Sequence, residues 1–206
     1  MKFIWRGKYT GPHQLPLGVL PEGAVQYQEP DTPEQLAKAA VPYSLWMLVL
    51  WLALGALKCL LWREWAFSCS LLGILLSLAL AIPHELIHGL FFPRKAEVEC
   101  FQAIRQGMFF VISTCPISRR RFLWLSAAPT LLFGLLPLGV WMLLPPGRWE
   151  LLYTLGGMSL QLGCGDLLNI HHTFMQVPPG AMVQLSGFHS YWFLPERGGK
   201  SAGGNG

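Results

Sequence analysis

The five residues His84-Glu85-Leu86-Ile87-His88 have the types and spacing needed for metal-assisted hydrolysis. On a helix, residues four positions apart leave the same face, so the imidazoles of His84 and His88 could hold one Zn²⁺ ion. Glu85 could then act as the base that takes a proton from a metal-activated water. Ionisable side chains are costly in an apolar run such as this one and usually serve a function there. The alternative is that the histidines lie at a membrane interface without metal.

The composition indicates a membrane protein. Only 13% of the 206 residues are charged, about half of the ~25% usual for soluble domains. The net charge of +4 is not a nucleic-acid footprint, because the basic residues fall in the segments between apolar runs. We therefore expect a lipid bilayer as a partner, and no nucleic acid.

The apolar runs predict an all-α polytopic membrane protein with about four transmembrane helices. The expected spans are about Tyr43–Leu61, Trp65–Phe92, Phe122–Leu144 and Leu151–Ile170. The loop 93–121 between the second and third spans should form a small β-hairpin, turning near Gln106 and Gly107, because its flanking segments are rich in β-forming residues.

Three parts follow from these spans. Residues 1–42 would be a cytoplasmic segment with a short interfacial helix at Pro33–Ala40, capped by Thr32 and separated from the first span by Pro42. Residues 43–170 would be the membrane domain. Residues 171–206 would be a cytoplasmic segment, disordered at its end.

Prolines and small residues predict where the spans bend and where they pack closely. Pro83 should kink the second span just before His84, and Pro129 and Pro137 should bend the third. Small residues form one stripe on the second span and another on the fourth, and we expect the two stripes to pack face to face. Lys58, near one end of the first span, should extend toward the headgroups.

The distribution of Lys and Arg predicts the orientation. Twelve lie in the tails and loop 93–121, whereas only Arg63 and Arg148 lie between spans on the other side. Because cytoplasmic loops carry the excess of basic residues, both termini and the long loop are placed in the cytoplasm.

Asp166 is the candidate third ligand. A catalytic zinc takes three protein ligands and one open position. Of the eleven acidic residues, only Glu85 and Asp166 lie within the apolar spans. His84–His88 and Asp166 each lie about four residues from the exit of their spans, roughly 6–12 Å inside the same face.

The sequence leaves open the roles of three further residues near Asp166. Asn169, three residues after Asp166, could hydrogen-bond a ligand or substrate, or could satisfy the backbone at the helix end. His171 and His172 could compete as the third ligand, donate to a ligand or to an oxyanion, or lie at the interface without metal.

The order of these motifs resembles the small putative zincin peptidase family of bacterial membranes. The resemblance rests on His84-Glu85-Leu86-Ile87-His88-Gly89-Leu90, a hairpin loop, Arg121-Phe122, Pro129 and then Gly165-Asp166. The chain is more distantly similar to site-2 protease, an intramembrane zinc protease, although Leu167 follows Asp166 where that family commonly has glycine. The resemblance implies His84, His88 and Asp166 as zinc ligands and Glu85 as the catalytic acid and base.

We therefore expect a zinc metallopeptidase of the bacterial cytoplasmic membrane, acting on a peptide or transmembrane-protein substrate. The substrate could pair as an unwound strand with the segment Met108–Ser113. An ion or proton pathway is one alternative, and a catalytically idle zinc-binding scaffold is another. The residues do not identify the cleavage site, the oxyanion-stabilising residue or the oligomeric state.

Overall fold

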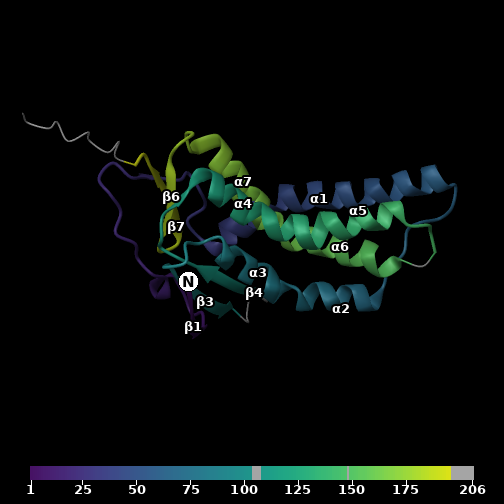
Figure 1. The fold of residues 1–206 in the computed structure, drawn as a ribbon, viewed down its shortest axis with the longest axis horizontal. Coiled ribbons are helices and arrows are strands. Elements are labelled where there is room, and N and C mark those ends of the chain that lie inside the picture. Colours follow the sequence, from purple (N-terminus) through teal and green to yellow (C-terminus); the bar gives the residue numbers. More distant parts are fainter. Residues whose placement is uncertain (104–107, 148, 196–206) are drawn as a thin grey trace, which may run out of the picture.

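The computed structural model describes residues 1–103, 108–147 and 149–195. A bundle of helices forms one end of the molecule, and a lobe containing two β-sheets forms the other (Figure 1). The expectation of an all-α protein with a single small hairpin is therefore wrong. The terminal segments add β1 (Lys2–Lys8), β2 (Val25–Gln26), β6 (Met182–Ser186) and β7 (His189–Phe193).

The helical elements are α1 (Pro33–Trp62), α2 (Leu71–Ala79), α3 (Ala81–Leu90), α4 (Arg119–Pro129), the π-helical η3 (Thr130–Leu135), α5 (Leu136–Leu143), α6 (Glu150–Leu162), α7 (Cys164–Gln176) and the short 3₁₀ helix η1 (Pro12–Gln14). Three stretches in the described residues are long and apolar enough to cross a membrane: Pro33–Trp62, Leu71–Leu90 and Arg119–Leu143.

The expected fourth long span is replaced by two shorter helices. α6 and α7 together run back from the far end of the bundle to the lobe, but they meet in a break at Gly163 (Figure 1). A Cβ atom at Gly163 would lie 2.0 Å from Thr130 Oγ1, so the break comes where η3 approaches most closely. The prediction of about four long apolar helices is thus corrected to three in the described residues.

Helix α1 begins as predicted but does not stop at Pro42. The Thr32 side chain accepts a hydrogen bond from the Gln35 amide at 3.2 Å, which confirms the N-cap. The helix then continues through Pro42 to Trp62, so the expected separate interfacial helix is wrong. Apolar environments tolerate proline within helices because neighbouring groups satisfy the freed backbone.

The other prolines act near their predicted positions. The second stretch breaks at Leu80, between α2 and α3. The ring of Pro83 would collide with the carbonyl of Ala79 in a regular helix, which accounts for a break at this point. In the third stretch, the π-helical η3 begins directly after Pro129.

The small-residue stripes pack differently from the prediction. Gly73, on α2, does face α6, with its nearest neighbours in Thr154. The stripe of α6 faces the third stretch instead, because Gly156 meets Leu138 and Gly163 meets Thr130. Each stripe therefore allows a close approach, but the two stripes do not pack on each other.

Lys58 is also placed differently from the prediction. It is fully buried within the bundle rather than extended toward the headgroups. Its ammonium group donates to the Trp141 carbonyl and lies 4.0 Å from the centre of the Trp141 ring. The carbonyl and the ring face replace the water that a charged group would otherwise require.

Among the described residues, the lobe contains the strands β1 (Lys2–Lys8), β2 (Val25–Gln26), β3 (Glu97–Ala103), β4 (Met108–Ile112), β5 (Ile117–Ser118), β6 (Met182–Ser186) and β7 (His189–Phe193). One sheet has the order β1-β3-β4, and the other has the order β2-β7-β6-β5. The antiparallel pair β3–β4 confirms the predicted hairpin. The turn expected near Gln106 and Gly107 lies outside the described residues.

Both terminal segments belong to this lobe. β1 pairs in parallel with β3, from Lys2 opposite Glu97 onward. The segment after β2 is tied to β7, because the buried Glu29 carboxylate accepts hydrogen bonds from the amide and the hydroxyl of Ser190. Burial nevertheless raises the pKa of Glu29, and the bonds from Ser190 only partly offset this effect.

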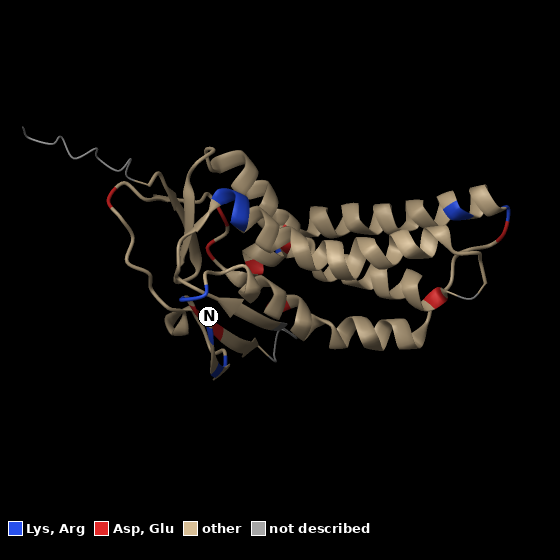
Figure 2. Ribbon diagram, in the orientation of Figure 1, with Lys and Arg blue, Asp and Glu red and all other residues tan. Residues whose placement is uncertain are grey.

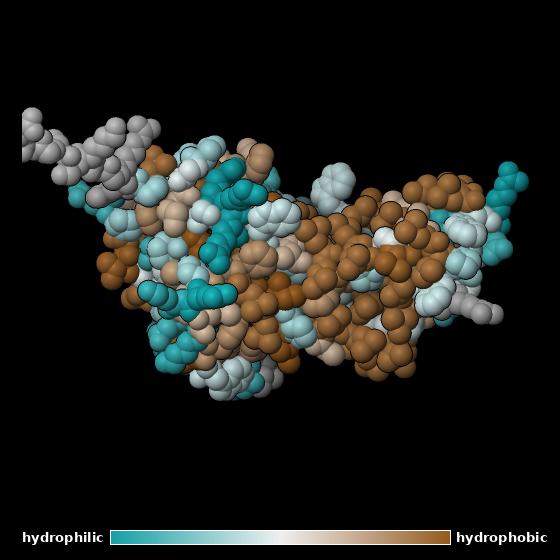
Figure 3. Space-filling view, in the orientation of Figure 1, coloured by the Kyte–Doolittle hydropathy of each residue, from teal (hydrophilic) through white to brown (hydrophobic). Residues whose placement is uncertain are grey.

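The surface divides in the same way as the fold. Apolar side chains cover the helical bundle, with polar residues on the lobe and at the far tip (Figure 3). Most basic residues of the described chain lie on the lobe or at its junction with the bundle, including Arg119, Arg120 and Arg121 at the start of α4 (Figure 2). The junction between lobe and bundle is therefore where the apolar belt ends.

Candidate metal centre

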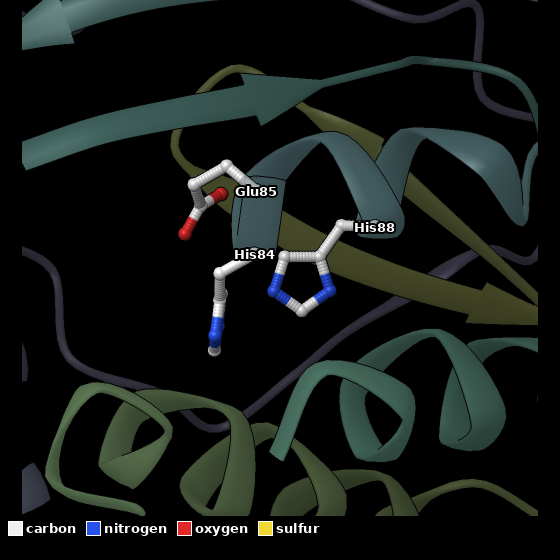
Figure 4. Close-up of side chains that lie close together, drawn as sticks. All are labelled: His84, Glu85 and His88. Carbon is white, nitrogen blue, oxygen red and sulfur yellow. The ribbon is translucent and has the colours of Figure 1, made fainter. Parts of the chain in front are cut away.

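The candidate ligands lie on two short helices at this junction. His84 and His88 leave the same face of α3, as their spacing predicted (Figure 4). Asp166 lies in the first turn of α7, where the free amides of a helix favour a negative charge. Each of these helices follows a break, at Leu80 before α3 and at Gly163 before α7.

The Asp166 carboxylate contacts both imidazoles. Its Oδ2 atom lies 3.0 Å from His84 Nε2, and its Oδ1 atom lies 3.2 Å from His88 Nε2. All three side chains are largely buried, with 5%, 10% and 13% of the side chains of His84, His88 and Asp166 exposed. The structure thus brings together the residues that the count of depth along the chain selected, with His84 and Asp166 82 positions apart.

The ring of His88 is fixed by the backbone of α4. His88 Nδ1 lies 2.8 Å from the Leu125 carbonyl oxygen. Because a carbonyl can only accept, Nδ1 carries a proton, and Nε2 of the same ring faces Asp166. Such a hydrogen bond to the second nitrogen is usual for histidines that bind metal. The sequence analysis missed Leu125, although the proline four residues later is a readable signal.

Glu85 leaves α3 on the side of strand β4, away from α7 (Figure 4). One ligand atom each from Glu85, His84 and His88 can be chosen so that all lie within 4.8 Å of one another. The backbone amide of Val111, in β4, faces the Glu85 carboxylate. Sequence reasoning gave β4 as a strand but did not place its edge beside this carboxylate.

The donor set fits a zinc ion. Ligands at about 2.0–2.2 Å from one tetrahedral ion lie about 3.3–3.6 Å apart. The two distances from Asp166 to the imidazoles are only a few tenths of an ångström shorter than this. His84 Nδ1 is buried and has no hydrogen-bond partner in the described part of the chain, which leaves the His84 ring free to adjust.

The other candidate residues, Asn169, His171 and His172, are not part of this cluster. The His171 ring packs edge-on against Tyr43 of α1, with centroids 5.9 Å apart, and the side chain is exposed. Burial, together with the adjacent His171, lowers the pKa of His172. Across residues 1–103, 108–147 and 149–195, neither these histidines nor Asn169 forms a hydrogen bond or ion pair with the cluster.

Comparison with known proteins agrees with this arrangement. The model of a family described as "putative zincin peptidase" matches residues 77–182, about half of the chain and the part that carries all three candidate ligands. No curated protein and no solved structure matches the chain, so the similarity to site-2 protease stays a likeness of motifs. With its histidines, glutamate and aspartate inside the matched segment, the chain belongs to the putative zincin peptidase family.

Proposed function

We propose that this protein is a membrane-embedded zinc metallopeptidase that hydrolyses peptide bonds of membrane or membrane-proximal substrates. The observation that carries the proposal is the Asp166 carboxylate, held between the Nε2 atoms of His84 and His88 at the end of the apolar belt. The family supports a zinc peptidase, and the three apolar stretches support membrane embedding.

His84, His88 and Asp166 would hold the metal, and Glu85 would move the proton. A bound zinc lowers the pKa of a water molecule to about 7 and polarises a carbonyl. Glu85 would accept the proton of the attacking water and later give it to the leaving amine. Its place between the imidazoles and β4 lies beside the position that a scissile peptide would take.

The edge of β4 would position the substrate. In the three-stranded sheet, β4 pairs with β3 on one side only, and its other side faces α3. A substrate helix must expose its backbone before cleavage, and an added strand supplies the replacement partners. Since the backbone direction alternates along a strand, Phe109 should share the outward direction of Val111. We expect Phe109→Pro to raise KM without loss of zinc, whereas Phe109→Ala controls for loss of the ring.

The basic residues support the proposed orientation. The described Lys and Arg on the lobe and at its junction far outnumber those at the opposite tip of the bundle (Figure 2). Following the excess of basic residues on cytoplasmic segments, we place the lobe, and with it both termini, on the cytoplasmic side of a bacterial membrane. The site would then open toward the cytoplasm.

The test uses the purified protein in detergent or in vesicles. Zinc content should be near one ion per chain and should collapse in His84→Ala. Cleavage of a membrane-peptide library should be lost in Glu85→Gln and retained in Glu64→Gln, a matched change at an exposed carboxylate on the far tip. Equal cleavage by wild type and Glu85→Gln would refute the mechanism. Zinc binding without cleavage would instead show an idle scaffold.

A further inference from the structure

The carbonyl group of Leu125 lacks its usual partner within helix α4. In an α-helix, the carbonyl of residue 125 accepts the amide hydrogen of residue 129. Residue 129 is proline, which has no amide hydrogen. The next amide, that of Thr130, donates to the Ala127 carbonyl instead. Pro129 therefore leaves one acceptor of α4 free in the interior of the protein.

The freed acceptor is taken by a candidate metal ligand. His88 Nδ1 lies 2.8 Å from the Leu125 oxygen, and both residues are buried, with 8% and 9% of their surface exposed. An unpaired carbonyl at this depth would cost about 1–3 kcal/mol. The bond to His88 satisfies the carbonyl and at the same time directs Nε2 of the same ring toward Asp166 Oδ1, 3.2 Å away.

We propose that Pro129 is a positioning residue, which reserves the Leu125 carbonyl for His88 and so holds the His88 ring in its ligand orientation. The inference rests on the proposed function in treating His88 as a zinc ligand. It assigns to Pro129 a role beyond bending the helix: any other residue would bring an amide hydrogen that competes with His88 Nδ1.

Pro137 offers a matched control within the same helical stretch. It lies at the start of α5, four residues after Phe133. In the described residues, no side chain donates a hydrogen bond to the Phe133 carbonyl, so this second proline frees no acceptor for the site. If proline acted only through helix shape, replacing either residue would affect the metal centre in a similar way.

The experiment compares Pro129→Ala with Pro137→Ala by zinc titration of the full-length protein. Changing a partner of a metal-binding histidine typically weakens metal affinity about 10–100-fold. We expect a loss of this size for Pro129→Ala and a change of less than about threefold for Pro137→Ala. Replacing Pro129 by lactic acid, whose ester link has no amide hydrogen, should restore the affinity. Equal affinities in wild type and Pro129→Ala, or a similar loss in the lactate variant, would overturn the proposal.

A second measurement does not require any proline variant to fold. In ¹⁵N-histidine NMR spectra of the zinc-free protein, with the His88 signal identified by its loss in His88→Gln, Nδ1 of His88 should carry a proton, as its contact with the Leu125 carbonyl requires. An Nδ1 without a proton would overturn the inference. A protein that shows the Nδ1 proton but binds no zinc would contradict the proposed function and leave the role of Pro129 standing, so the two failures are distinguishable.

Discussion

Replacing Asp166 with asparagine keeps the shape of the side chain and removes its charge. Substitutions one layer outside a metal typically weaken its affinity by 10–100-fold. Loss of a charged ligand should reach at least the upper end of this range, about 100-fold, which corresponds to about 2.7 kcal/mol. We therefore expect Asp166→Asn to bind zinc at least about 100-fold more weakly than the wild type.

The same substitution should also destabilise the metal-free protein. The carboxylate lies 3.0 and 3.2 Å from two buried imidazole nitrogens. Hydrogen bonds to a charged partner contribute about 1.5–3 kcal/mol each, and bonds between neutral partners contribute about 0.5–1.5 kcal/mol. Replacing two hydrogen bonds to a charged partner by two between neutral partners should lower the free energy of unfolding by about 2–3 kcal/mol. Solvent weakens this effect little, because only 13% of the Asp166 side chain is exposed.

Competition against a chromophoric chelator measures the affinity, and denaturant unfolding in detergent without metal measures the stability. Asn169→Ala is the control, since Asn169 lies one turn further along α7 and forms no hydrogen bond with either imidazole in the described structure. His171→Ala and His172→Ala should also bind zinc like the wild type. An Asp166→Asn variant with wild-type affinity, beside a His172→Ala variant without zinc, would refute the ligand assignment.

Further predictions concern the close contacts and the buried carboxylate of the lobe. Gly163→Ala would bring a Cβ atom to 2.0 Å from Thr130 Oγ1, and should destabilise the protein by about 1–3 kcal/mol. Gly165→Ala meets nothing within 4 Å and should be tolerated in the same unfolding assay. Leu160 is completely buried, so Leu160→Ala should lower the free energy of unfolding by about 2–5 kcal/mol in denaturant titrations. Because the pKa of Glu29 is raised in the folded state, the folded protein binds its proton more tightly. Stability should therefore fall as pH rises from the ordinary carboxyl pKa through the raised one, and Glu29→Gln should flatten this dependence in melting curves; an unchanged slope would contradict the assignment.

The proximity of His84, His88 and Asp166 could be predicted from the sequence. Ionisable groups are costly in an apolar span, so Glu85 and Asp166 stood out among eleven acidic residues. The helical spacing of His84 and His88 then fixed their common face. The number of residues between each motif and the end of its span then gave its depth, because each residue of a helix adds a fixed rise along the bundle.

The β-lobe could not be derived in the same way. β1 pairs with β3 across about 95 residues, and β2 pairs with β7 across an even longer separation. Neither β1 nor β2 alternates polar and apolar residues strongly, and β2 contains only Val25 and Gln26. Their pairing depends on the packing of the whole lobe, so the terminal segments were predicted without a sheet.

The errors in the bundle have a different cause. Hydropathy gives the length of an apolar run, but it does not show whether the run forms one uninterrupted helix. Pro42 was expected to end a helix, but α1 continues through it. Gly163 was counted inside a span, but α6 ends there, at a position that requires glycine because the Thr130 side chain occupies the space of a Cβ. Lys58 was assigned to the headgroups, but a carbonyl and a ring of Trp141 enclose it.

The two helix breaks and the candidate ligands belong to one arrangement. The break at Leu80 lies four residues before His84, and the break at Gly163 lies three residues before Asp166. Straight helices packed along the bundle would fix the direction of both ligands by the packing of the whole span. With a break just before each ligand, α3 packs on β4 and α4, and α7 packs on α1 and α4. Gly89 of α3 lies against the Phe3 ring of the lobe. The lobe therefore supports the candidate site through α3, and a change in its packing at Gly89, next to His88, should alter zinc affinity.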